Sequence, residues 1–408
     1  MPMTVTEAGR TLADPAAYAD DDLLHAALSL LRSEAPVHWV EAPGYNPFWA
    51  VTRHADIQEV ERENRIFLSA PRPVLVGAST DAAHKRSETG RTALRPLIHL
   101  DGHEHQRMRG VTADRFRPQA VGDLEPRIRA LARKAVDHMR EVGPVCEFVR
   151  DVSDVYALDV LLSLMGLDGS ESAQVFRFTP AGRRVLPPEA RQTAMREFYT
   201  YFLELAARRR ASPADDLASV IANARLDGRL LDDREMLSSF IIILAAGHDT
   251  AGATIAGGLK ALVENPGQLS RLREHPEGLP AAVDEMIRWV TPVKAFMRTA
   301  VQDYKLRDVV IRKGDSVLLS YPSANRDETV FDDPHRFDVE RTPNRHLAFG
   351  YGVHHCLGAA LAKLEILAFF AELLPRIEHV EMAGAPANVS STFSGGPKHL
   401  PLRYSWAD

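Results

Sequence analysis

The segment Phe349-Gly350-Tyr351-Gly352-Val353-His354-His355-Cys356-Leu357-Gly358 holds one of the chain's two cysteines and three glycines. Glycine lets a backbone approach a ligand closely or adopt dihedral angles that other residues avoid. A helical pattern begins directly behind Cys356, so we expect its sulfur near a helix N-terminus. Backbone N–H donors and the helix dipole stabilise a thiolate there. The segment therefore predicts a cysteine with a chemical role.

General chemistry offers three roles for a Cys356 thiolate. His354, His355 and Cys356 form a candidate zinc site, but adjacent ligands do not readily share one tetrahedral metal, and no second cysteine-rich element exists. A nucleophilic cysteine needs a distant His and an orienting Asn or Asp, and these residue types occur elsewhere in the chain. The third role is an axial thiolate ligand of haem iron.

Phe349, Gly352, Cys356 and Gly358 match all four fixed positions of a known haem-ligand signature, so the segment resembles that of the cytochrome P450 superfamily. The resemblance implies that Cys356 binds the iron of haem b and that Gly352 and Gly358 are structural. It implies a mainly α fold with small β-sheets, with haem between a long central helix and the cysteine-loop helix. The segment TPNRHLAFGYG (342–352) looks like the bacterial terpineol-hydroxylating branch.

The composition is typical of a folded globular protein: 408 residues, 45% hydrophobic and 25% charged. It argues against a disordered chain, a collagen and a small disulfide-stapled scaffold. The net charge of −6 does not favour a nucleic-acid binder. Cys146 and Cys356 are far apart in sequence, which fits a reducing compartment.

The N-terminal segment and the most apolar run bear on where the protein is located in the cell. Residues 1–22 are acidic and lack the apolar core of a signal peptide. The most apolar run, Phe240–Ala246, is stopped by Gly247-His248-Asp249. A spanning helix needs about 20 apolar residues. We therefore expect a cytoplasmic protein without a membrane anchor.

Apolar residues three and four apart predict helices over most of the chain after residue 120. These helices are expected over residues 124–141, 154–166, 190–210, 232–262 and 358–375. Short apolar pieces over 39–53 predict strands, and 305–320 predicts a hairpin with a Lys-Gly turn. We expect a flexible N-terminal arm over 1–22 and a single haem domain over 23–408, since the resemblance requires distant segments to converge on one haem.

Glu285 and Arg288 lie three residues apart, on one face of a predicted helix. Taken alone, the pair is an ordinary surface ion pair worth a few tenths of a kcal/mol. Beside the cysteine segment it resembles the superfamily's Glu-x-x-Arg pair, which with a later arginine locks the chain before the cysteine loop. That arginine would be Arg341, whose forked guanidinium suits a buried carboxylate better than lysine.

The sequence Gly247-His248-Asp249-Thr250 lies inside a predicted helix, where these residue types are unfavourable. It resembles the oxygen-binding kink of the superfamily's central helix. The resemblance implies that Thr250 hydrogen-bonds iron-bound oxygen and that Asp249 carries protons inward from solvent. We expect His248 to face a groove beside the helix, away from the iron.

His105 and Arg109 share a helix face and match the superfamily's His-x-x-x-Arg contact to the haem propionates. Arg298 and His354 match two further propionate contacts. Four partners for two carboxylates are chemically sensible, because buried charges need pairing.

By position, the resemblance places six side chains around the substrate. They come from the central helix, the strand after the Glu-x-x-Arg helix and the last turn of the chain: Leu244, Ala245, Val293, Lys294, Phe296 and Phe393. Residues 70–100 would form a lid, as a long loop. Most of these residues are apolar or small, which suits a compact hydrophobic substrate such as a monoterpenoid or alkyl-aromatic. Lys294 is the exception, either directed away or meeting a polar substrate group.

The implied function is a monooxygenase that inserts one oxygen atom of O2 into a C–H bond. Electrons would come from NAD(P)H through a ferredoxin reductase and an iron–sulfur ferredoxin, with Arg107, Arg115 and Lys363 as a possible basic docking patch. The chain is expected to be a monomer. The alternatives are a peroxide-driven haem-thiolate peroxygenase, which the Asp249–Thr250 pair argues against, a haem-binding sensor or carrier without turnover, and a cysteine hydrolase.

Overall fold

A computed structural model describes residues 2–88 and 94–407 of the chain. Helices dominate it, and the predicted class of a mainly α protein with small sheets is confirmed. The helices are α1 (Val5–Thr11), α2 (Asp21–Glu34), α3 (His54–Arg62), α4 (Ala78–Glu88), α5 (Gly102–Ala113), α6 (Pro118–Asp123), α7 (Glu125–Val142), α8 (Asp154–Met165), α9 (Ser172–Phe178), α10 (Pro180–Val185), α11 (Pro188–Ala211), α12 (Leu217–Asn223), α13 (Asp233–Gly247), α14 (Asp249–Glu264), α15 (Pro266–Glu274), α16 (Leu279–Val290), α17 (Tyr321–Ala324) and α18 (Ala359–Leu373).

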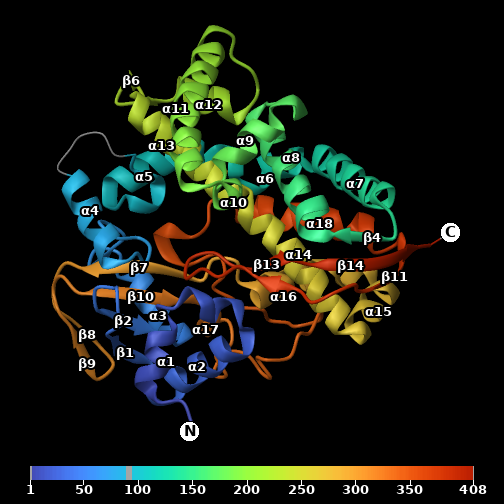
Figure 1. Cartoon of the computed structure of the whole chain (residues 1–408). Helices are drawn as coiled ribbons and strands as arrows, with labels where there is room; N and C mark the ends of the chain where they lie inside the picture. The colour runs from blue at the N-terminus through green and yellow to red at the C-terminus, as the bar shows by residue number, and fades with distance from the viewer. Residues whose placement is uncertain (1, 89–93, 408) are drawn as a thin grey trace.

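The largest sheet has the strand order β1-β2-β10-β7-β3. Its strands are β1 (Val37–Val40), β2 (Phe48–Val51), β10 (Ser316–Ser320), β7 (Ala295–Ala300) and β3 (Phe67–Leu68). The central strand β10 is buried along its whole length, parallel to β2 and antiparallel to β7. Figure 1 shows this sheet beside the blue N-terminal helices. The sheet places β7, and with it Arg298, facing the helical part of the molecule.

The expectation of a flexible arm over residues 1–22 is wrong for most of that segment. Helix α1 begins with a capping box between Thr4 and Glu7. Ala8, Leu12 and Tyr18 are buried in one cluster with the sheet and α2. Val5 and Ala8 are too few for the helical periodicity to stand out in a seven-residue segment, but burial against the sheet stabilises the helix.

The central helix runs through the middle of the molecule as α13 and α14 (Figure 1). The two segments meet at His248, whose backbone departs from regular helix geometry. By length and composition alone, Asp233–Glu264 could cross a membrane. Half of the most apolar 18-residue stretch of this helix is buried inside the fold, as in the core helix of a globular protein. The predicted helix over 232–262 is thus present, with an interruption at the Gly-His-Asp-Thr sequence.

Helices α7, α8, α14, α16 and α18 share the largest hydrophobic core. The sheet β11-β14-β4 closes one side of it, with β11 (Ile377–Met382), β14 (Pro401–Trp406) and β4 (Val145–Glu147) all antiparallel. A second core lies among α8, α11, α12 and α13. Between these cores and the five-stranded sheet, α13, α14 and α18 line the cavity described below.

The predicted hairpin over 305–320 and the predicted loop over 70–100 are both present, but each differs in detail from its prediction. The hairpin within 305–320 turns at Arg307 and Asp308, between β8 (Tyr304–Leu306) and β9 (Val309–Ile311); Gly314 precedes β10 of the larger sheet. The predicted long loop over residues 70–100 contains helix α4, while residues 89–93 lie outside the described residues.

The remaining strands pair as β5 (Arg225–Leu226) with β6 (Arg229–Leu230) and β12 (Ala387–Asn388) with β13 (Pro397–His399).

Candidate active site

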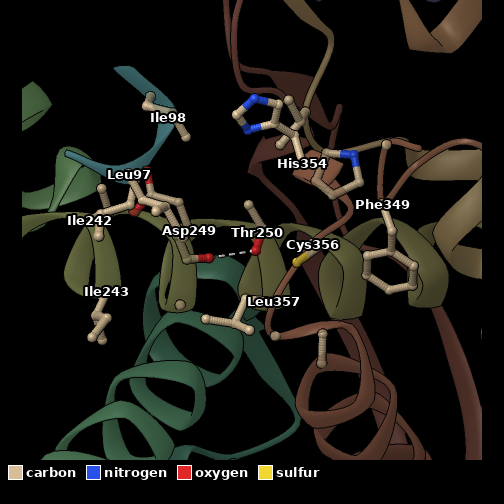
Figure 2. Close-up of a pocket in the computed structure, with 18 of the residues that line it drawn as sticks. Leu97, Ile98, Ile242, Ile243, Asp249, Thr250, Phe349, His354, Cys356 and Leu357 are labelled. Carbon is tan, nitrogen blue, oxygen red and sulfur yellow. Dashed lines mark hydrogen bonds between the residues drawn. The ribbon is translucent and has the colours of Figure 1, made fainter. Parts of the chain in front are cut away.

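One cavity of about 350 Å³ brings together segments from residue 61 to residue 394. Cys356 and Gly358 line it from the cysteine loop, and Asp249 and Thr250 line it from the central helix. Figure 2 shows Cys356, Asp249 and Thr250 around the same pocket, together with the apolar side chains of Ile242 and Ile243. Most of the lining is aliphatic or aromatic, while charged residues gather where β7, α5 and the cysteine loop meet.

The cysteine loop has backbone conformations that require glycine. Gly350 and Gly352 have φ values of +68° and +67°, where L-side chains are strained. A Cβ on Gly352 would also lie 2.9 Å from the carbonyl oxygen of Glu61. The Cys356 N–H donates to the carbonyl oxygen of Phe349 at 2.8 Å, which closes the loop. These features hold Cys356 directly before α18 and facing the cavity.

The local environment does not by itself produce a Cys356 thiolate. Burial raises the pKa of Cys356, while the Gly358 N–H and the nearby Arg109 charge act in the lowering direction. The Gly358 N–H thus acts in the direction expected of a helix N-terminus, against the effect of desolvation. Among residues 2–88 and 94–407, no group of three or more His, Cys, Asp or Glu side chains could hold a metal ion. The zinc alternative thus finds no support there.

A buried ion cluster consists of Glu285, Arg288 and Arg341. Arg288 donates to both carboxylate oxygens of Glu285 at 2.7 Å, and neither side chain is exposed. Arg341 approaches Glu285 at 3.2 Å. Arg288 also donates to the carbonyl oxygens of Asn325, Pro334 and Arg336, and Arg341 to those of Asp332, Asp333 and Arg336. The cluster therefore ties α16 to the irregular chain before Cys356.

The four candidate propionate contacts lie together at the polar end of the cavity. The rings of His105 and His354 have centroids 4.2 Å apart, and Arg109 and Arg298 line the same end. Burial lowers the pKa of His105 to about 4 and also lowers that of His354. At neutral pH the two histidines are therefore neutral donors, and the positive charge resides on Arg109 and Arg298. Arg109 donates to the carbonyl oxygen of His355 at 2.7 Å.

Glu61 is a member of this group that the sequence analysis missed. Its Oε1 accepts hydrogen bonds from Tyr321 at 2.8 Å and Arg298 at 3.2 Å, while its buried Oε2 has no hydrogen-bond partner among the described residues. Burial raises the pKa of Glu61 to about 7, against the effect of Arg298. The partners are more than 230 residues away in sequence, and the surrounding ERENR sequence looks like an ordinary exposed helix.

Asp249 and Thr250 lie side by side at the helix interruption (Figure 2). The Thr250 hydroxyl donates to the carbonyl oxygen of Ala246 at 2.8 Å. The Asp249 carboxylate contacts His248, the N–H of Ala181 and Arg184. Burial would raise the pKa of Asp249, but His248 and Arg184 outweigh it and lower the pKa. Asp249 is thus an anion held on the side of α10, next to the cavity.

Four of the six predicted pocket residues line the cavity, namely Ala245, Val293, Phe296 and Phe393. Leu244 does not, because it lies on the face of α13 that packs in the core with α8 and α11. Lys294 does not line it either, since its Nζ donates to the carbonyl oxygen of Val290 at 2.8 Å. Burial lowers the pKa of Lys294 to about 8.

Residues of the predicted lid also line the cavity. Arg95, Leu97 and Ile98 contribute to it, and the Arg95 N–H donates to the Ser238 hydroxyl of α13 at 2.9 Å. The sequence analysis missed the α13 residues Ile242 and Ile243, although their place one turn before Gly247 could have identified them.

The basic residues suggested as a docking patch are each paired with a carboxylate. Arg107 contacts Asp227, Arg115 contacts Asp215 at 2.6 Å, and Lys363 contacts Asp284 at 2.6 Å. These three positions therefore contribute little net positive charge to a docking face.

Comparison with known proteins adds an independent line of evidence. The family model described as Cytochrome P450 matches residues 170–393. Cytochrome P450-terp of Pseudomonas sp is 37% identical, with 98% of this chain and 97% of that protein covered. The chain belongs to the cytochrome P450 family.

Other P450 relatives agree. The Steroid C26-monooxygenase of Mycolicibacterium smegmatis is 33% identical, with 95% of each chain covered. The crystal structure of CYP108D1 from Novosphingobium aromaticivorans is 37% identical and superimposes with a TM-score of 0.91 over the whole of both chains. The resemblance to the terpineol-hydroxylating branch is confirmed, and this P450 is an oxidoreductase that incorporates oxygen from O2.

The cavity fits the haem that the family implies. Cys356 lines the cavity, and a Cβ on Gly358 beside it would meet no atom within 4 Å. At the polar end, two arginines and two neutral histidines can pair with two carboxylates. The donor set and the open glycine therefore suit a flat group with an anionic edge.

Proposed function

We propose that this P450 inserts one oxygen atom of O2 into a C–H bond of a compact hydrophobic molecule, a monoterpenoid or an alkyl-aromatic. The observation that carries the proposal is a single, largely apolar cavity lined by both Cys356 and the Asp249–Thr250 pair. Cys356 would hold haem b, which would supply the activation of dioxygen, so that one oxygen atom enters the substrate and the other is released as water. Arg109, Arg298, His105 and His354 would hold its propionates.

The protein's own residues orient the substrate and control protons. Ala245, Val293, Phe296 and Phe393 offer apolar contacts, so they exclude water from the reacting C–H bond. Thr250 presents a hydroxyl to the cavity, and Asp249 lies one residue before it with contacts toward the α10 surface. In this proposal Asp249 takes protons from solvent and Thr250 passes them inward.

Electrons would come from an iron–sulfur ferredoxin and its NAD(P)H-dependent reductase, since the sequence has no additional cysteine cluster for an iron–sulfur centre. We place the enzyme in a reducing compartment, the cytoplasm, because its two cysteines are distant in sequence. We propose that it acts as a monomer. The chain would form one domain that includes residues 5–22, because cavity-lining residues come from positions 61 to 394.

The substrate class can be tested by the spin-state change of the ferric enzyme on ligand binding. We expect monoterpenoids or alkyl-aromatics to displace iron-bound water and shift the Soret band, and steroids to do so more weakly. Steroids serve as the comparison ligands, because one relative is named Steroid C26-monooxygenase. Tighter binding of steroids than of monoterpenoids would contradict the proposed substrate size.

The alternatives are separated by Thr250→Ala in a reconstituted ferredoxin assay. Loss of coupling between electron use and product formation supports the proposed proton path. Unchanged coupling contradicts it, and no turnover with either variant favours a haem-binding sensor or carrier. Peroxide-driven turnover that matches ferredoxin-driven turnover favours a peroxygenase.

A further inference from the structure

His248 is completely buried next to the proposed proton path. Its side chain has no exposed surface, although it lies between Gly247 and Asp249 at the helix interruption. The ring packs edge-on against Phe176 of α9, with centroids 5.7 Å apart. A buried titratable ring needs defined hydrogen-bond partners.

Both ring nitrogens of His248 face acceptors. Nδ1 lies 3.0 Å from Oδ1 of Asp249, and Nε2 lies 3.0 Å from the backbone carbonyl oxygen of Asp154 in α8. A neutral imidazole donates through one nitrogen only, so the other would place a lone pair against an acceptor. Both contacts are favourable when the ring carries two protons, as an imidazolium that faces the Asp249 carboxylate and the Asp154 carbonyl oxygen.

The charges around the ring support this protonation state. The carboxylates of Asp154 on α8 and Asp249 on α14 lie near it, while Arg183 and Arg184 on α10 approach Asp249 from the other side. Burial lowers the pKa of His248, but the Asp249 hydrogen bond and the two carboxylates outweigh it and raise the pKa. The neighbouring face of α9 contributes the uncharged Phe176.

The two oxygens of Asp249 are held differently. Oδ1 accepts from His248 at 3.0 Å and from the N–H of Ala181 at 3.2 Å. Oδ2 lies 2.9 Å from the Arg184 guanidinium without a well-aligned hydrogen bond. Arg184 is 43% exposed on the short helix α10, whereas His248 belongs to the central helix interruption itself. The Arg184 contact can be released by solvent, and the His248 contact cannot.

We propose that His248 is a positioning residue, held as a buried imidazolium that anchors Oδ1 of Asp249 and leaves Oδ2 as the atom that carries protons. When Arg184 separates from Asp249, Oδ2 takes a proton from water and releases it toward Thr250, so Asp249 ends unchanged. The proton-carrying part rests on the proposed function, while the charge and anchoring of His248 do not. Loss of His248 leaves Oδ1 with the 3.2 Å hydrogen bond from the Ala181 N–H as its remaining contact on the buried side.

The charge state is tested in the wild-type holoenzyme by nitrogen NMR of labelled histidine in the diamagnetic ferrous carbon monoxide complex. The signals are assigned with His248→Gln, and exposed His138 is the internal control. We expect the His248 ring to lose its second proton at a pH above the ordinary value of about 6.5. A midpoint at or below that value overturns the proposal.

The positioning role is tested by the pH dependence of coupling. An opposite charge within hydrogen-bond distance commonly lowers a carboxyl pKa by about 1 unit or more. His248→Gln should therefore move the Asp249-dependent midpoint up by about 1 pH unit and reduce coupling without changing KM, while His138→Gln changes neither. If Thr250→Ala uncouples but His248→Gln matches wild type, the His248 role is wrong and the proposed function stands. If Thr250→Ala leaves coupling unchanged, the proton path itself is wrong.

Discussion

Glu285 and Asp249 are both buried carboxylates with two cationic neighbours, yet they are built differently. Glu285 accepts from Arg288, Arg341, Asn344 and the backbone N–H of Asp338. Asp249 has one anchored oxygen and one oxygen held only by a partly exposed arginine. A saturated buried charge is fixed in one arrangement, whereas an incompletely satisfied one can change partners. The first arrangement suits the support of a cysteine loop, and the second suits proton transfer.

Breaking the saturated cluster should have the largest effect. Arg288→Ala leaves Glu285 as a buried charge without its bidentate partner and frees three backbone carbonyls, so we expect a loss of about 3–5 kcal/mol in the free energy of unfolding. The measurement is denaturant unfolding together with haem content after purification. Arg271→Ala is the matched control, because its ion pair with Glu340 is half-exposed and should contribute about 1 kcal/mol or less. Similar losses in the two variants would contradict the locking role.

Changing the incompletely satisfied carboxylate should affect turnover more than folding. Asp249→Asn keeps the side-chain shape but cannot carry a proton as an acid, so we expect product formation to fall by about 100-fold or more. The free energy of unfolding should change far less than in Arg288→Ala. Asp233→Asn, an exposed position at the start of α13, is the control. Wild-type turnover by Asp249→Asn would remove it from the proton path.

Glu365 offers a third case, because it is a buried carboxyl with no cationic partner among residues 2–88 and 94–407. Burial alone raises its pKa to about 8 from an ordinary 4.5. The folded state therefore holds a proton that the unfolded state has lost above pH 4.5, so this contribution to stability falls as pH rises toward 8. Glu365→Gln, which cannot ionise, should gain about 2–3 kcal/mol over wild type between roughly pH 6 and pH 8.5.

The Glu365 measurement is denaturant unfolding of both holoenzymes at the two pH values. Glu372→Gln, on the same helix and close to Arg133 at 3.3 Å, is the control and should show little pH-dependent difference. An equal pH dependence in wild type and Glu365→Gln would show that Glu365 is ionised or solvated in the folded protein.

Short-range sequence patterns predicted much of this molecule. The spacing in the cysteine loop, the three-residue step from Glu285 to Arg288 and the periodicity of the long helices are local features, and they indicated the fold and its family. Helix α1 was not predicted, because a segment of seven residues shows too little helical periodicity, although packing against the sheet stabilises it.

Side-chain direction and distant pairing could not be predicted in this way. Leu244 and Ala245 are adjacent, but only Ala245 lines the cavity, because rotation of about 100° per residue turns Leu244 into the core. Lys294, which precedes β7, donates to the carbonyl oxygen of Val290 at the end of α16. Glu61 meets Arg298 and Tyr321 only after the sheet and α3 come together. These properties depend on tertiary packing.

The central claim is that Cys356 provides the thiolate ligand of haem iron in the cavity it shares with Thr250. The most direct measurement is the absorbance spectrum of the reduced protein with carbon monoxide, for wild type and Cys356→Ser. We predict a long-wavelength Soret band typical of thiolate ligation in the wild type and its loss in Cys356→Ser. A protein without haem, or a histidine-type band that the substitution leaves unchanged, would contradict this account.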